Sequence, residues 1–359
     1  MKEPFVRIVK RPADSFAHKA LVRAVAIILA LIVNAFFIYF VTGLNPLNVY
    51  TVMFKGTFGN VMRFSWAIRD MVTLLGIGIA LAPAFKMRFW NIGAEGQVLM
   101  GAMATALVMV YCGNSMPTPL LFIVMIAASI AAGGIWGFIP AYFKSKWRTN
   151  ETLFTLMMNY VAISIVAALT NYMRGQASSL GKLNMGTQAG WMPKFLGQGY
   201  NINILIIGIL TVLVYMYLKF SKHGYEIAVI GESENTALYA GINVKKVRIR
   251  TMIISGAICG LIGFLIVSGR DQTISTNTAG GNGFTAIIVA WLAKFNTFYM
   301  ALISFLLIFL TKGAAEIASA YALNDFAADI ITAVILFFIL GSEFFINYRL
   351  VFRGKGGER

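Results

Sequence analysis

The stretch FWNIGAEGQVLMGAMA, residues 89–104, places polar and glycine residues at the start of a long apolar run. Glu95 lies between Gly93 and Gly96, with Asn91 and Gln97 on either side. Such a segment exposes backbone groups that lipid cannot satisfy, so it must face protein or a watery cavity. The stretch therefore predicts a membrane helix that is interrupted near the path of a transported solute.

Composition around this stretch supports a membrane location. The chain is 58% hydrophobic and only 12% charged, whereas an average soluble domain is about 25% charged. No single core in water absorbs so much apolar surface. The net charge of +16 does not indicate nucleic acid, because the basic residues cluster between apolar runs, where anionic lipid attracts them. We expect an all-α polytopic membrane protein that contacts membrane lipid and no nucleic acid.

A membrane helix needs about 20 mostly apolar residues, and the sequence holds about ten such segments. They cover residues 24–42, 66–85, 92–112, 119–142, 153–173, 202–218, 251–268, 283–294, 297–311 and 327–345. With the N-terminus in the cytoplasm, ten spans leave only eight of the 30 lysines and arginines outside, which the positive-inside rule favours. The prediction is a basic cytoplasmic tail at 1–23, a membrane domain at 24–345 and a cytoplasmic tail at 346–359.

The segment after the break predicts a helix that another helix can approach closely. Asn91 is expected to cap this helix, and Glu95 lies in its first turn, where the helix dipole favours a negative charge. Small or polar residues recur every four positions, at Gly93, Gln97, Gly101 and Thr105. Two interpretations of Glu95 stay open: it stabilises the end of its own helix, or it lines the solute path.

A second break, STNTAGGNGFTA at 275–286, contains Asn282 and Phe284. The span before this second break crosses the membrane in the direction opposite to that of the span before the first break. The two breaks therefore suggest an inverted repeat with the solute site between its halves. Thr155 and Asn159 are one helical turn apart. They are expected either to form interhelical hydrogen bonds or to line the solute path. Two GxxxG pairs, at residues 133 and 137 and at 256 and 260, are weak packing signals.

The cytoplasmic loop at 219–250 contains GESENTALYAGIN, residues 231–243. Ser233 is a good N-cap, Glu234 suits the first turn, and Gly241 suits the position after the helix. A helix of about two turns is not stable alone in water. It either docks on a motor that drives transport or rests on the membrane as an amphipathic connector.

No motor is predicted within the chain. The phosphate-binding pattern GxxxxGK[ST] is missing, and no nucleophile–base group is apparent. The two cysteines, Cys112 and Cys259, have no metal-binding spacing. We therefore expect a transport subunit that is not an enzyme and holds no cofactor.

Four motifs together resemble the permease subunits of bacterial ABC importers. They are NIGAEGQ at 91–97, TLMMNYVA at 155–162, GESENTALYAGINV at 231–244 and GFTAIIVAWLAKFN at 283–296. The similar branch includes ribose, simple-sugar and branched-chain amino acid permeases, and NIGAEGQ is most like its nucleoside and simple-sugar members. Thr285 stands where related permeases often have aspartate.

The resemblance implies an ATP-driven importer in the bacterial inner membrane, with 24–345 as its permease domain. The partners would be an ATPase that binds ATP and magnesium, a second and shorter permease, and an external solute-binding lipoprotein or periplasmic protein. The solute would be a nucleoside, or alternatively a simple sugar; an ion-coupled secondary transporter is the rival class. The expected path residues are Asn91, Glu95, Gln97, Thr155, Asn159, Asn282 and Phe284. The expected residues for coupling to the ATPase are Ser233, Glu234, Tyr239 and Gly241.

Overall fold

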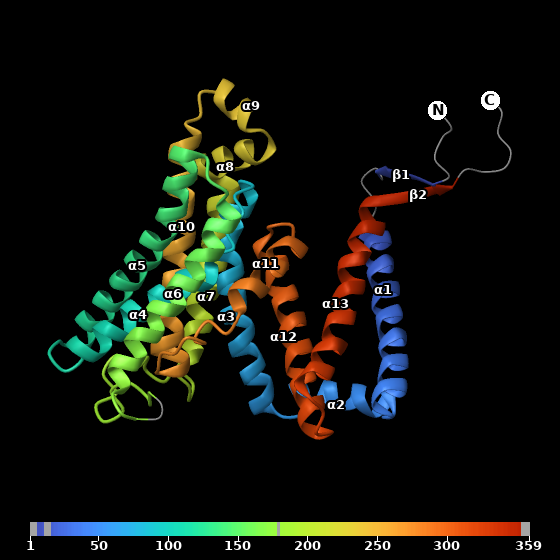
Figure 1. The fold of residues 1–359 in the computed structure, drawn as a ribbon, viewed down its shortest axis with the longest axis horizontal. Helices are drawn as coiled ribbons and strands as arrows, with labels where there is room; N and C mark the ends of the chain where they lie inside the picture. Colours follow the sequence, from blue (N-terminus) through green and yellow to red (C-terminus); the bar gives the residue numbers. More distant parts are fainter. Residues whose placement is uncertain (1–5, 11–15, 178–179, 353–359) are drawn as a thin grey trace. The chain divides into compact units, whose positions relative to one another are not determined.

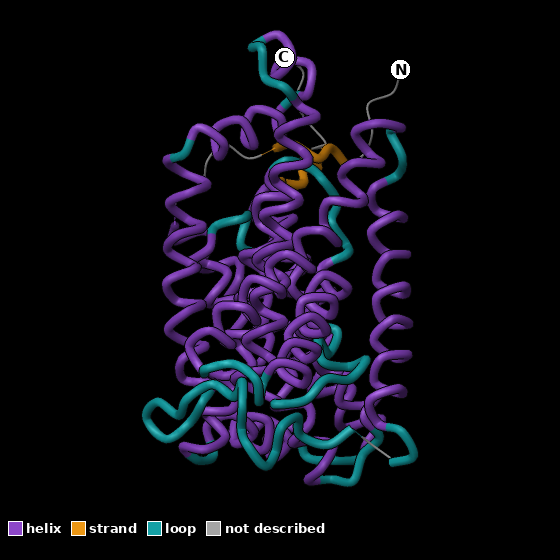
Figure 2. The backbone as a smooth tube through the Cα atoms, turned by 90° about the vertical axis from the view of Figure 1, so that its left-hand side faces the viewer, coloured by secondary structure: helices purple, strands orange, loops and turns teal. Residues whose placement is uncertain are grey.

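The structure is a computed structural model that describes residues 6–10, 16–177 and 180–352. Helix accounts for most of the described backbone (Figure 2), and the one sheet among these residues pairs two short strands. The elements are β1 (Val6–Lys10), α1 (Phe16–Phe37), η1 (Ile38–Thr42), α2 (Pro46–Phe58), α3 (Val61–Lys86), α4 (Ala94–Cys112), α5 (Thr118–Trp147), α6 (Glu151–Arg174), α7 (Tyr200–Phe220), α8 (Lys222–Glu232), α9 (Glu234–Tyr239), α10 (Val244–Leu265), η2 (Ile266–Asp271), α11 (Asn282–Leu292), α12 (Thr297–Ala320), α13 (Asp325–Asn347) and β2 (Tyr348–Phe352). The predicted all-α membrane fold is confirmed.

Each of the ten predicted spans coincides with a helix, and nine helices in the described part are long and apolar enough to cross a membrane. The exception is α11, whose 11 residues cover about 16 Å at about 1.5 Å per residue, half of a hydrocarbon core of about 30 Å. The span predicted at 283–294 is therefore present as a short helix, about half as long as a full crossing. Gly280 and Gly281 both have a positive φ, which ends regular structure there, so residues 272–281 reach α11 as irregular chain.

The number of crossings follows from the pairing of the strands. β1 pairs antiparallel with β2, from Val6 opposite Phe352 to Lys10 opposite Tyr348. The start of α1 and the end of α13 therefore lie at the same end of these helices, which requires an even number of crossings. The nine long helices of the described part, together with the shorter crossing at residues 272–292, meet this requirement with ten.

The chain forms two compact units, which we call the terminal unit (residues 1–67 and 308–359) and the central unit (residues 68–307). The expected membrane domain at 24–345 includes parts of both. In the terminal unit α1 packs along α13, and the buried Asn34 side chain donates to the carbonyl of Ile331 at 3.0 Å. α2 begins at Pro46 with Asn45 as its cap, and Arg63 pairs with Glu316 at 2.6 Å.

The centre of the central unit is the packing of α4, α5 and α10 (Figure 1). A Cβ atom built on Gly133 would lie 2.3 Å from the carbonyl oxygen of Gly256, and one on Gly101 would lie 2.3 Å from the Cα of Gly260. Only glycine permits the backbones to approach so closely. In a membrane, where no hydrophobic effect drives helices together, such close van der Waals packing stabilises their association. The small faces predicted on these three helices are therefore close contacts between backbones.

The two ends of the central unit differ. At one end α8 and α9 pack together, and Arg248 of α10 pairs with Glu234 at 3.3 Å; we call this the α8–α9 end. At the other end, residues 180–199 form an irregular loop that is bonded to the helix ends. Asn184 donates to the carbonyl of Met109 at 2.6 Å, and Ser268 donates to that of Gly190 at 2.6 Å. We call this second end the loop end.

Candidate functional site

The first break, residues 87–93 between α3 and α4, is held by polar side chains of α6. Thr155 Oγ1 accepts from the N–H of Ile92 at 3.1 Å and donates to the carbonyl of Glu151 at 2.8 Å. Asn159 donates to the carbonyl of Ile92 at 2.9 Å and accepts from the N–H of Gly96 at 2.8 Å. Both side chains are buried. The structure thus places both in the interhelical bonds that satisfy the broken backbone.

Asn91 and Gln97 form a second set of hydrogen bonds at the first break. Their side-chain amides bond to each other at 3.3 Å, and Asn91 Nδ2 also donates to the Ser255 hydroxyl of α10 at 3.4 Å. Asn91 Oδ1 accepts from the N–H of Gly93 at 3.0 Å. The expectation that Asn91 caps α4 is wrong in detail, because Gly93 is the N-cap and Asn91 closes the turn before it.

Glu95 joins the two breaks. It is only 5% exposed, and its two carboxylate oxygens accept from the N–H groups of Gly281 and Gly283, each at 2.8 Å. These donors are at the N-terminus of α11, where the helix dipole favours an anion. Glu95 therefore binds the N-terminus of α11, while it also lies in the first turn of its own helix, α4.

α4 and α11 start side by side and run to opposite ends of the central unit. A Cβ atom on Gly283 would lie 2.5 Å from the backbone nitrogen of Glu95, so the two N-termini touch. α4 continues to Met109 at the loop end, whereas the last turn of α11 reaches Phe85 at the end of α3 (Figure 1). α4 and α11 thus belong to two broken crossings in opposite orientation, as the sequence predicts. An inverted repeat that relates the two halves of the chain stays a prediction.

Four aromatic rings gather where the breaks approach the α8–α9 end. Trp90 precedes the first break and stacks on Trp291 of α11, with ring centroids 5.1 Å apart. Phe85 contacts both rings edge-on, and Phe295 contacts Trp291. Each tryptophan is 44% exposed in this chain. Trp291 lies nine residues after Asn282, which is about 13 Å along α11. Because Glu95 contacts the N-terminus of α11, the rings lie about the length of this short helix away from Glu95.

The remaining expected path residues, Asn282 and Phe284, lie in the first turn of α11. Asn282 is half-buried and donates to the carbonyl of Ala279 at 2.8 Å, within its own turn. Phe284 is 42% exposed. The structure thus gathers Asn91, Glu95, Gln97, Thr155 and Asn159 around the breaks, where they bond to protein, and leaves Phe284 on the surface. Contact of any of these residues with a solute stays a prediction.

The expected coupling segment forms the short helix α9. Ser233 is its N-cap and accepts from the N–H of Thr236 at 3.2 Å, and Gly241 follows the helix with φ +74°. Glu234 lies in the first turn, and Tyr239 is 93% exposed. The predicted caps and helix are therefore confirmed, while docking of an ATPase on them stays a prediction.

A second helix of the α8–α9 end, α8 itself, contacts both α9 and the last residue of α3, and the sequence did not predict it. A Cβ atom on Gly231 of α8 would lie 2.1 Å from the carbonyl oxygen of Lys86, the last residue of α3. A polar hollow of about 300 Å³ adjoins this contact and is lined by both segments, from Met87 and Phe89 to Ser233 and Glu234. Motion of α8 and α9 would therefore reach the first break directly.

His223 lies in the first turn of α8 and connects this helix to α7 and α10. Its imidazole is 3% exposed, shares a hydrogen bond with the Tyr217 hydroxyl of α7 and lies 3.4 Å from the Thr251 hydroxyl of α10. Burial lowers the pKa of His223 below its ordinary value, and the neighbouring Arg250 charge lowers it further. The neutral imidazole is thus the form that joins the three helices.

Sequence reasoning missed Trp90, Ser255, Gly231 and His223. Trp90 borders the quoted break directly, so its position was an available signal. Ser255, Gly231 and His223 act through contacts with segments far away in the chain, and nothing next to them in sequence marks those contacts.

Comparison with known proteins gives the family. Residues 64–340 match the family model described as "Branched-chain amino acid transport system / permease component". The chain is 31% identical to the guanosine ABC transporter permease protein NupP of Bacillus subtilis, over 90% of this chain and 93% of NupP. It is 27% identical to the glucose ABC transporter permease protein TsgB13 of Haloferax volcanii, over 88% and 86% of the two chains. It is 26% identical to the nucleoside ABC transporter permease protein NupB of Lactococcus lactis, over 90% and 91%. The chain therefore belongs to the family of branched-chain amino acid transport system permease components, as a multi-pass membrane subunit that is not itself an enzyme.

Proposed function

We propose that the chain conducts a nucleoside across the bacterial inner membrane, as one permease subunit of an ATP-driven importer. The observation that carries this proposal is the similarity to NupP and NupB, a guanosine and a nucleoside permease, along about nine tenths of the chain. The resemblance of the NIGAEGQ segment to nucleoside and simple-sugar permeases points the same way.

The chemistry of the breaks suits a neutral polar solute. The side chains gathered there are amides and hydroxyls, apart from Glu95, whose two oxygens already accept backbone hydrogen bonds. Because the side chains around the breaks bond to protein, a solute would reach them only when the breaks separate. Trp90 and Trp291 lie one short helix away and offer flat faces on which a planar base could stack.

The driving force would come from a separate ATPase, which binds ATP and magnesium and docks on α9. Tyr239 and Leu238 of α9 are exposed and offer apolar contacts. Force on α9 would pass through α8 to residues 86–87 and so to the first break. The termini and the α8–α9 end would face the cytoplasm, and an external lipoprotein or periplasmic protein would deliver solute at the loop end. A second permease of the shorter kind would complete the membrane part.

A simple sugar is the second candidate solute, because the chain is also similar over most of its length to the glucose permease TsgB13. A sugar, like a nucleoside, is neutral and rich in hydroxyl groups, so the amides around the breaks suit both. The aromatic faces favour a nucleoside, since only the nucleoside carries a planar base.

Uptake into vesicles that contain the assembled complex tests the proposal. We expect radiolabelled guanosine to accumulate only with ATP at the α8–α9 end and with the binding protein outside. Accumulation of glucose, and not of guanosine, would favour the sugar alternative. Uptake that continues without ATP under an ion gradient would instead indicate a secondary transporter.

A further inference from the structure

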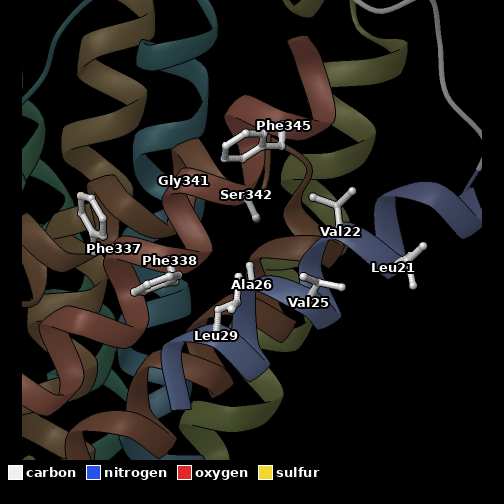
Figure 3. Close-up of a pocket in the computed structure, with 10 residues that line it drawn as sticks. All are labelled: Leu21, Val22, Val25, Ala26, Leu29, Phe337, Phe338, Gly341, Ser342 and Phe345. Carbon is white, nitrogen blue, oxygen red and sulfur yellow. The ribbon is translucent and has the colours of Figure 1, made fainter. Parts of the chain in front are cut away.

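A hollow of about 580 Å³ lies between α1 and α13 in the terminal unit (Figure 3). It is lined by Leu21, Val22, Val25, Ala26, Leu29, Phe337, Phe338, Gly341, Ser342 and Phe345. The one polar side chain among them, Ser342, already donates its hydroxyl to the carbonyl of Ile339 at 2.6 Å. The hollow is therefore apolar, and its volume lies within the range of about 300–1,000 Å³ that is usual for small-molecule sites.

The length of the hollow corresponds to one leaflet of a bilayer. Leu21 to Leu29, and likewise Phe337 to Phe345, are eight residues apart, or about 12 Å at about 1.5 Å per residue. One leaflet of a hydrocarbon core of about 30 Å is about 15 Å deep. The lining residues lie in the halves of α1 and α13 that adjoin β1 and β2, so the hollow occupies the leaflet on the side of the termini.

The hollow is lined by residues of different sizes. Its floor is formed by small residues: Ala26 is buried, and a Cβ atom built on Gly341 would meet no heavy atom within 4 Å. Its rim carries larger and exposed side chains such as Leu21 and Phe337 (Figure 3).

The charges near the hollow favour an anion at one end. Arg23, half-exposed, pairs with Glu343 at 2.5 Å beside the lining residues. Arg7 of β1 and Arg349 of β2 are exposed at the same end of α1 and α13. Among the described side chains there, the arginines outnumber the one carboxylate. A phosphate in the membrane surface would complement the excess positive charge.

We propose that an acyl chain of an anionic membrane phospholipid occupies this hollow, with its phosphate at the Arg23 end. The proposal rests on four features together: an apolar lining, a length of one leaflet, a floor open at Gly341 and arginines at the outer end. It does not depend on the identity of the transported solute.

Filling the floor tests the proposal. Gly341→Leu would project a side chain into the hollow, and Gly208→Leu on α7 is the matched control, since a Cβ there also meets no heavy atom within 4 Å. Native mass spectrometry of the complete complex, released from membranes that contain phosphatidylglycerol, would count the bound phospholipids. We expect Gly341→Leu to lose one phospholipid per chain and Gly208→Leu to lose none. Equal phospholipid counts in the wild type and Gly341→Leu would overturn the proposal.

Two further variants give a result even where Gly341→Leu does not assemble. A benzophenone amino acid at Phe338 should crosslink to phospholipid; a crosslink to a protein chain would show that a helix fills the hollow and would overturn the proposal. Arg23→Gln should keep the phospholipid but reduce the preference for phosphatidylglycerol over phosphatidylcholine. An unchanged preference would overturn the placement of the phosphate.

Discussion

Glu95 stands in the first turn of α4, yet both of its carboxylate oxygens serve the N-terminus of α11. A carboxylate accepts two N–H bonds at once, which no other side chain of similar size does without adding a donor. Glu95 is therefore the residue that ties the two broken crossings together in this conformation. Its position between two helix N-termini also explains how a charge is tolerated at membrane depth.

The first prediction concerns the two acceptor oxygens of the Glu95 carboxylate. In Glu95→Gln one oxygen is replaced by an NH₂ group, which leaves one backbone N–H of Gly281 or Gly283 unpaired at a cost of about 1–3 kcal/mol. Thermal unfolding of the purified complex should show lower stability for Glu95→Gln, and lower still for Glu95→Ala, with reduced uptake in both. Glu232→Gln, which changes an exposed glutamate, is the control for stability. Lost uptake with unchanged stability would instead indicate that Glu95 contacts the solute.

The second prediction concerns the pH dependence of stability at His223. Because its pKa is lower in the folded protein, the unfolded chain binds more protons as the pH falls through and below the ordinary value of about 6.5. The contribution of the neutral form to stability is therefore present above that value and is lost as the pH falls toward the folded pKa. We expect the unfolding temperature of the wild type to fall more steeply between about pH 7.5 and about pH 5.5 than that of His223→Gln. A wild-type slope in His223→Gln would contradict the prediction.

At the scale of elements, α8 is the physical connection between α9 and the first break. Gly231→Ala would place a Cβ atom 2.1 Å from the carbonyl of Lys86, so α8 must shift, and overpacking of this kind costs about 1–3 kcal/mol. We expect Gly231→Ala to retain ATPase binding but to lose most solute-stimulated ATP hydrolysis, measured on the reconstituted complex. Gly208→Ala, a helix glycine with open space around it, should be neutral or stabilise by about 0.5–1 kcal/mol. Full stimulation in Gly231→Ala would show that α8 does not transmit force.

The fourth prediction concerns the surface of α9. Tyr239 is 93% exposed, so Tyr239→Ala should change the stability of the chain by no more than about 0.5 kcal/mol. A buried aromatic contact in an interface is worth about 2 kcal/mol or more, so co-purification of the ATPase should fall strongly. Tyr225→Ala on α8, also at an exposed tyrosine, serves as the control. Undiminished co-purification with Tyr239→Ala would refute the docking role of this residue.

At the scale of the whole molecule, the sequence predicts the membrane helices well because the bilayer fixes their length and composition. The caps Ser233 and Gly241 were predictable too, since capping acts within a few residues. The partner of Glu95 was not: Gly281 and Gly283 lie 186 and 188 residues away in the chain. Short elements such as α2, α8 and the β1–β2 pair also escaped, because their stability comes from contacts that no local pattern records.

The last prediction concerns the side of the membrane that each end of the central unit faces. The hollows at the α8–α9 end are lined by Lys86, Arg88, Lys144, Lys219, Arg248 and Lys294. Such a concentration of cations is typical of the cytoplasmic side. Single cysteines test this placement in a Cys112→Ser background, where the native Cys259 is buried. In intact spheroplasts a membrane-impermeant maleimide should label Met185→Cys at the loop end, which is exposed, and should spare the exposed Leu238→Cys until the membrane is permeabilised. The reverse pattern would put α9 on the side without ATP, which would exclude its coupling to an ATPase but leave the contact between Glu95 and α11 unaffected.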